Sequence, residues 1–83
     1  MLKLKIVSPE KIEFTGEVES VTVPGALGNF QILTGHAPLI SSLTDGKVEY
    51  TTNTGEKNCI AITGGVASVH KDEVSLCVEK QLA

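Results

Sequence analysis

The segment from residue 23 to residue 39, VPGALGNFQILTGHAPL, carries more structural information than any other part of the chain. A valine-rich run ends at Val23, and Pro24-Gly25 then predicts a type II turn, because proline presets φ at the second position and glycine accepts a positive φ at the third. A short apolar strand follows at residues 30–33. Residues 34–38 predict a shaped loop, in which Pro38 keeps the preceding residue out of the α region. The segment therefore predicts two strands, a tight turn and a rigid loop.

Alternation of apolar and polar residues extends in both directions from this segment. Residues 2–6 alternate leucine or isoleucine with lysine, and Val74, Leu76 and Val78 occupy every second position near the other end. Such period-2 patterns are typical of half-buried strands. Turn residues recur about every 8–12 positions, which favours an antiparallel sandwich or flattened barrel. The other predicted turns are Thr44–Gly46, Asn53–Gly55, Gly64–Gly65 and Lys71–Asp72, and we expect Asp45-Gly46 and Gly64-Gly65 to close hairpins.

The alternation changes phase once, in the valine-rich run before residue 24. Phe14 and Val18 share one phase, whereas Val21 and Val23 are offset from it by one residue. Without a correction, this offset would turn the later side chains to the wrong face of the sheet. A β-bulge near Glu19-Ser20 restores the alignment by adding one residue to this strand.

Length and composition exclude several classes of protein. The 83 residues fit one domain, residues 1–83, and its small core would gain from a stabilising partner. The net charge is −3 and the chain has no arginine, so it lacks the basic stripe that nucleic-acid binding requires. No apolar run approaches the length of a membrane-spanning helix, and the N-terminus lacks the apolar region of a signal peptide. We expect the chain to stay in the compartment where it is made and to reach a membrane only through another protein.

No catalytic or metal-binding motif appears in the sequence. The nucleophile-elbow, phosphate-loop and dinucleotide-binding patterns are absent, and Cys59 and Cys77 fit small, reduced strand residues better than metal ligands. The pair Asp72-Glu73 fits a solvated turn. We therefore predict a non-enzyme without a cofactor or metal, in which His70 is a surface residue and Gly25, Gly28 and Gly35 are turn glycines.

His36 has two interpretations from its local sequence. It lies between Gly35 and Ala37-Pro38, so it could be an interface residue on a rigid loop, or it could hydrogen-bond the backbone of its own loop. A small hydrolase built on His36 with Ser41 or Ser42 is a further hypothesis, but the residues around these serines carry no motif for it.

Residues 23–39 resemble the signature stretch of the ATP synthase epsilon subunit family, with a valine-rich strand, a glycine-containing loop, a short apolar strand and then Gly-His-Ala-Pro-Leu. Other blocks of the chain resemble this family in the same order. They are Ile6–Glu10, Gly16–Val18, Leu43–Val48, Ile62–Val66 and Val74–Leu76. The resemblance covers nearly all 83 residues with the family's spacing intact.

The resemblance implies an all-β fold, a flattened ten-stranded antiparallel β-sandwich at the foot of the central stalk. It implies a non-catalytic rotor subunit of the proton-translocating F-type ATP synthase, on the cytoplasmic face of the bacterial inner membrane. The implied partners are the gamma subunit, the c-ring and, indirectly, the alpha/beta catalytic head. By position, the gamma interface would contain Ser8, His36, Pro38, Leu39 and Ser41, and the c-ring interface Ala26, Leu27, Gly28, Asn29, Phe30 and Gln31. The competing hypothesis is a free-standing β-sandwich that binds a peptide or a carbohydrate.

The chain departs from the family pattern at several positions. Thr34 stands where many members have proline, Gln31 replaces a common glycine, and Asn29 replaces a frequent acidic residue, which puts a charge-based c-ring contact there in doubt. Most members also continue into a helical hairpin, whereas this sequence stops at Ala83. Its initial methionine and its lack of a tag favour a naturally short form, and residues 79–83 could begin no more than a helical turn.

Overall fold

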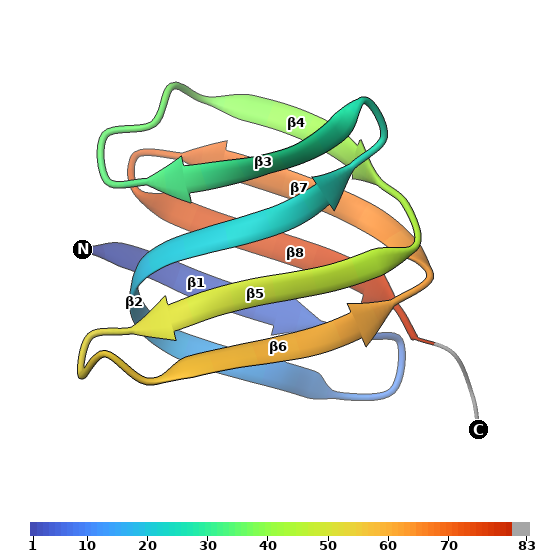
Figure 1. Cartoon of the computed structure of the whole chain (residues 1–83), viewed down its shortest axis with the longest axis horizontal. Coiled ribbons are helices and arrows are strands. Elements are labelled where there is room, and N and C mark those ends of the chain that lie inside the picture. The colour runs from blue at the N-terminus through green and yellow to red at the C-terminus, as the bar shows by residue number, and fades with distance from the viewer. Residues whose placement is uncertain (81–83) are drawn as a thin grey trace.

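The computed structural model describes residues 1–80, which form eight β-strands arranged in two layers (Figure 1). Strands β3, β2, β5 and β6 lie side by side in the front layer of Figure 1, and β4, β7, β8 and β1 lie behind them. The strands are β1 (Leu2–Val7), β2 (Ile12–Gly25), β3 (Gly28–Leu33), β4 (Leu39–Leu43), β5 (Gly46–Thr52), β6 (Lys57–Ile62), β7 (Gly64–His70) and β8 (Glu73–Glu79). The all-β prediction is confirmed.

The core lies between the two layers and follows the alternation in the sequence. In β1 and β8 every second side chain is buried, so the predicted faces of these strands are confirmed. Phe14 and Tyr50 close one side of the core with their ring centroids 4.5 Å apart. The buried apolar residues are Leu2, Leu4, Ile6, Val18, Val21, Val23, Ile32, Leu43, Val48, Tyr50, Ile62, Ala67, Val69, Val74, Leu76 and Val78.

Strand β2 is long because it belongs to both layers. Its first half pairs with β1, from Ile12 to Val18, and its second half pairs with β3 and β5. The register with β5 shifts between Val18 and Ser20, where the sequence predicts a bulge, and Val18, Val21 and Val23 are all buried. The irregularity lets one strand keep its apolar side chains in the core while it passes between the layers.

The strand count and the strand directions differ from the prediction. The described residues form eight strands, whereas the resemblance implies ten, and one continuous β2 occupies a place in each layer. The sandwich is also not purely antiparallel, because β1 and β8 pair in parallel from Lys3–Glu73 to Val7–Cys77. These two strands come from opposite ends of the chain, so no tight turn forces them to run in opposite directions.

Two of the predicted hairpins are instead crossings between the layers. Residues 44–45 lead from β4 to β5, and residue 63 leads from β6 to β7, but neither pair of strands is hydrogen-bonded. The glycines Gly46 and Gly65 do adopt positive φ, at 155° and 149°. A bend does lie at residue 45, within the predicted turn Thr44–Gly46, but Gly64 and Gly65 both belong to β7, so the turn predicted there is wrong. The sequence also did not show which layer receives the next strand.

Of the other predicted turns, two are confirmed and one lies at a different place in the chain. The turns at Asn53–Gly55 and Lys71–Asp72 are confirmed, since they connect the paired strands β5–β6 and β7–β8. The type II turn at Pro24-Gly25 is wrong, because both residues belong to β2 and the chain turns at residues 26 and 27. The positive φ is at Gly28, at 129°, not at Gly25.

Near the C-terminus, Glu79 is the last residue of β8. The rest of the helical turn considered for residues 79–83 lies mainly outside the described residues.

Candidate interaction surface

The β2–β3 hairpin presents an uncharged, apolar tip. Leu27, at the turn, is fully exposed, and none of residues 26–31 is charged. Behind the tip, Gly25 is buried, and a Cβ there would lie 2.8 Å from both the Phe30 ring and the Gly28 carbonyl oxygen. Only glycine allows Phe30 to pack this closely under the tip. The packing of Phe30 against Gly25 thus supports the turn that exposes Leu27.

Strand β4 lies beside this hairpin and is tied to it by the backbone. The Ala26 N–H donates to the Ser42 carbonyl oxygen at 3.0 Å. Along β4, Leu39 and Leu43 face the core, whereas Ile40 on the other face is 80% exposed. Of the predicted gamma-interface residues, Leu39 is half-buried against the core and Ser41 shares its phase. Ile40 was not named in the predicted gamma set, because the sequence alone does not show which of Leu39 and Ile40 faces outward.

Together the hairpin tip and β4 line one shallow depression of about 440 Å³. We call it the hairpin–β4 surface; its residues are Gly25, Ala26, Leu27, Gly28, Phe30, Leu39, Ile40, Ser41 and Ser42. Most residues of the predicted c-ring set and two of the predicted gamma set therefore lie on one continuous surface. Exposed apolar side chains gathered in this way are typical of sites that bind another protein.

The His36 loop lies at the other end of β3 and β4. The His36 N–H donates to the Leu33 carbonyl oxygen at 3.1 Å, and His36 Nδ1 lies 2.7 Å from the Ala37 carbonyl oxygen. The imidazole thus contacts its own loop backbone, as one of the two interpretations predicts, while its interface role stays a prediction. Pro38, in the same loop, is exposed.

Asp72 holds this loop and was not identified from the sequence. Its Oδ1 accepts the Gly35 N–H at 2.8 Å, although the two residues are 37 positions apart. Asp72 was predicted to be part of a solvated turn, and no local pattern reveals a partner so distant in sequence. The contact joins the β7–β8 turn to the His36 loop.

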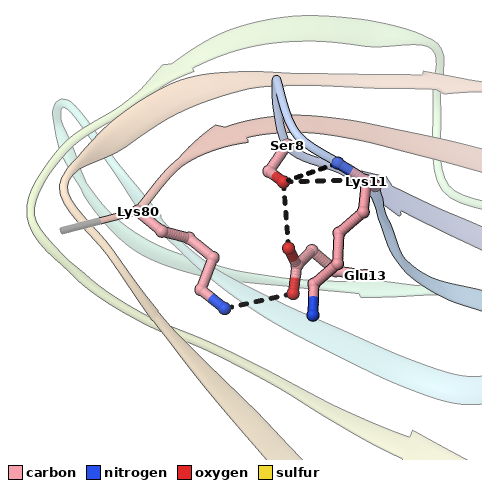
Figure 2. A network of polar contacts seen from close by, with 4 residues as sticks. All are labelled: Ser8, Lys11, Glu13 and Lys80. Atoms are coloured by element: carbon pink, nitrogen blue, oxygen red, sulfur yellow. Dashed lines mark hydrogen bonds and ion pairs between the residues drawn. The ribbon is translucent and has the colours of Figure 1, made fainter. Parts of the chain in front are cut away.

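Ser8 lies apart from the other predicted gamma-interface residues. It follows the far end of β1, whose first residues lie next to Asp72, so the length of β1 separates it from the His36 loop. In Figure 2 its hydroxyl points to Glu13, and it donates to Glu13 Oε2 at 2.9 Å. The Ser8 N–H also donates to the Lys11 carbonyl oxygen at 2.9 Å. Ser8 therefore stabilises the β1–β2 turn.

Glu13 connects this turn to the end of β8. Its Oε1 lies 3.1 Å from Lys80 Nζ, and the Glu13 side chain is only 8% exposed. The hydrogen bond from Lys80, followed by the one from Ser8, lowers the pKa of Glu13 below its ordinary value. These bonds favour the ionised carboxylate.

Comparison with known proteins identifies the family. The whole chain except its last residue, residues 1–82, matches the family described as ATP synthase, Delta/Epsilon chain, beta-sandwich domain. The chain belongs to this ATP synthase delta/epsilon family. It is 39% identical over 83 residues to the ATP synthase epsilon chain of Wolinella succinogenes, covering all of this chain and 63% of that protein. It is 43% identical over 77 residues to the epsilon chain of Chlorobium limicola, covering 93% of this chain and 88% of that protein.

Solved structures show the same fold as this delta/epsilon-family domain. One match is a chain of the Euglena gracilis mitochondrial ATP synthase, with a TM-score of 0.89 and 23% identity, covering 98% of this chain and 52% of that one. Another is a chain of the central stalk and c-ring assembly of the Tetrahymena thermophila mitochondrial ATP synthase, with a TM-score of 0.80 and 14% identity, covering 95% and 63%. The β-sandwich architecture is therefore that of the family.

Within residues 1–80, this delta/epsilon-family domain has no side-chain cluster suited to holding a metal ion. No three His, Cys, Asp or Glu side chains in this range are grouped to hold a metal ion. The Ser41 hydroxyl contacts the neighbouring Ser42 carbonyl oxygen, not His36, which gives no support to the hydrolase hypothesis. Cys59 and Cys77 are free thiols, exposed on β6 and β8. No helix in the described range is long and apolar enough to cross a membrane.

Proposed function

We propose that this domain is a non-catalytic part of the rotor of a proton-translocating F-type ATP synthase, where it couples c-ring rotation to the gamma subunit and to ATP synthesis. The observation that carries the proposal is the match of residues 1–82 to the delta/epsilon family, together with relatives that are named ATP synthase epsilon chains. In this role the chain is an accessory subunit, and catalysis belongs to the alpha/beta head.

The c-ring contact is assigned to residues 26–31. The tip of the β2–β3 hairpin projects a fully exposed leucine and two polar side chains, Asn29 and Gln31, without charge. A contact of this kind depends on apolar burial and neutral hydrogen bonds, and salt should therefore weaken it little. The packing of Phe30 against Gly25 holds the tip in place, so the tip loses little conformational entropy when it docks.

The gamma contact is assigned to Ser8, His36, Pro38, Leu39 and Ser41. We add Ile40, because it is the most exposed apolar side chain on β4 and extends the hairpin–β4 surface toward the His36 loop. Ser8 would contribute through the backbone shape of the β1–β2 turn, since its hydroxyl already binds Glu13. In these assignments the β4 part of the gamma contact adjoins the c-ring contact on the hairpin–β4 surface, whereas Ser8 forms a separate part.

The work of such a domain is mechanical. A rotor element that transmits torque must not deform between its two contacts, and a two-layer sandwich with a continuous core meets this need. In this proposal the domain meets the membrane only through the c-ring, on the cytoplasmic face of the bacterial inner membrane.

The structure gives no support to a free-standing carbohydrate-binding module. Such a module needs exposed aromatic side chains, but Tyr50 is buried, and Phe14 and Phe30 pack against the core.

Affinity purification of the tagged full chain from gently solubilised membranes of its source tests the proposal. We expect the gamma subunit, c-ring and catalytic subunits to be recovered with it. A matched chain with Leu27→Asp and Ile40→Asp should recover much less of them while remaining folded. If the unaltered chain is well folded and recovers none of these subunits, the rotor role is wrong.

A further inference from the structure

We propose that Asp72 is a positioning residue, which holds the loop of residues 34–38 in the shape that docks on the gamma subunit. The inference rests on the proposed function. It assigns a role to a side chain outside both predicted interfaces, on the β7–β8 turn.

The contact reaches the loop at Gly35. Gly35 has φ +84°, a conformation that L side chains rarely adopt, and no atom lies near the place where a Cβ would be. Gly35 therefore has open space on the side where a side chain would lie. Its N–H is fixed by Asp72 Oδ1 at 2.8 Å, directly before the His36 N–H that bonds the Leu33 carbonyl oxygen.

Asp72 is itself firmly placed. Lys71 and Asp72 form the two-residue turn of the β7–β8 hairpin with φ values of 50° and 61°. Aspartate tolerates this left-handed region better than most residues. The Asp72 carbonyl oxygen also accepts the Lys3 N–H at 2.9 Å, which ties the turn to β1. The backbone of Asp72 is therefore anchored by three strands, β1, β7 and β8.

A carboxylate acceptor makes this a charge-assisted hydrogen bond, which is stronger than a bond between neutral groups. By restricting Gly35, it restricts the direction in which His36 and Pro38 leave the end of β3. A loop already held in its bound shape loses less conformational entropy when it docks. Asp72 thus raises the affinity of the loop for its partner without touching that partner.

Two substitutions distinguish the role of the Asp72 acceptor oxygen from the role of residue 72 in the turn conformation. Asp72→Gly removes the acceptor and keeps the left-handed turn relaxed, whereas Asp72→Asn keeps an acceptor oxygen in a residue that also suits this φ. Glu73→Gln, next in sequence, controls for the loss of one negative charge. All three are made in the full 83-residue chain.

Amide hydrogen exchange at Gly35 and the affinity for an F1 sector depleted of its epsilon chain are the two measurements. For Asp72→Gly we expect at least about tenfold faster exchange at Gly35, unchanged exchange in β7 and β8, and about fivefold weaker binding to F1. Asp72→Asn should restore most of the affinity, and Glu73→Gln should bind like the unaltered chain.

Two results would overturn the inference. Unchanged Gly35 exchange in Asp72→Gly would show that the carboxylate does not hold the loop, and faster exchange with full affinity would show that loop order does not matter for docking. If the unaltered chain does not bind F1 at all, the proposed function itself fails and the docking role with it, while the exchange data still decide whether Asp72 holds the loop.

Discussion

Lys80 Nζ lies 3.1 Å from Glu13 Oε1, so the residue that follows β8 is paired with the second residue of β2. The other Glu13 oxygen accepts the Ser8 hydroxyl, and one carboxylate thereby joins the β1–β2 turn to the end of the last strand. Figure 2 shows that the two partners approach Glu13 from different sides. This link lies in the turn that carries Ser8, one of the predicted interface residues.

The first prediction concerns the pH dependence of this link. Since the pKa of Glu13 is lowered in the folded chain from its ordinary value of 4.5, ionised Glu13 stabilises the fold above about pH 4.5. That contribution is lost as the pH falls through the lowered folded-state pKa. Glu13→Gln should therefore lower the melting temperature more at pH 7 than at pH 3, as measured by circular dichroism. Glu10→Gln, in the same turn but outside the network, is the control. An equal effect of Glu13→Gln at both pH values would contradict this account.

The second prediction concerns the tip of the β2–β3 hairpin. Leu27→Ser removes an apolar side chain that we expect to be buried at the c-ring, which should weaken that contact by about 2 kcal/mol. Because Leu27 is fully exposed in the free chain, the free energy of unfolding should change by less than about 0.5 kcal/mol. Proton-driven ATP synthesis in membrane vesicles and denaturant unfolding measure the two effects.

Ile12→Ser is the matched control for Leu27→Ser. Ile12 is also an exposed apolar residue, at 58%, but it lies at the start of β2, away from the tip. Normal ATP synthesis with Leu27→Ser, or an equal loss of ATP synthesis with Ile12→Ser, would show that residues 26–31 do not form the c-ring contact.

The third prediction concerns the crossing into β7. At Gly65 a Cβ would overlap with the Cys77 carbonyl oxygen and lie 2.9 Å from Val78 Cα, and φ is also positive, at 149°. Gly65→Ala should therefore combine backbone strain with overpacking and destabilise the fold by about 3 kcal/mol or more. Gly55→Ala is a strain-only comparison, because its φ is +88° but no atom lies within 4 Å. We expect about 1 kcal/mol there by urea unfolding. Equal losses in the two variants would show that the close approach of β8 is unimportant.

The fourth prediction concerns the core. Leu76 is fully buried between the layers, and Leu76→Ala should lower the free energy of unfolding by about 2–5 kcal/mol. Leu33→Ala removes the same atoms from a side chain that is 50% exposed, so it should cost about 1 kcal/mol or less. Urea unfolding of both variants measures the difference, and a similar loss at the two positions would mean that burial of Leu76 between the layers does not determine its contribution.

Much of the fold was predictable because it follows the local alternation of apolar and polar residues in the sequence. The alternation in β1 and β8 identified buried faces, and the change of phase before Val21 located the irregularity in β2. The parallel β1–β8 pair and the two crossings were not predictable in this way. A glycine reports the φ of its own position, such as Gly46 or Gly65, but not whether the next strand joins the same layer or the opposite one.

The candidate interaction surface was likewise predictable only in part. The lack of charge in residues 26–31 was evident from the sequence, although the turn was predicted at Pro24-Gly25. Leu39 and Ile40 are both apolar, and only the burial of Leu43 decides that Ile40 points outward. Asp72 escaped notice because its partner, Gly35, is 37 residues away. Long-range contacts of this kind depend on how the loops meet in space.

The parallel pairing of β1 with β8 also determines when the domain can close during protein synthesis. Strand β1 leaves the ribosome first, but one of its two neighbours is the last strand in the described part of the chain. Until β8 is made, one edge of β1 has unpaired backbone groups, and unpaired edges promote association with other chains. Closure through such distant segments is slow compared with the formation of a local hairpin. The time between translation of the two strands therefore sets how long the nascent chain exposes an open edge.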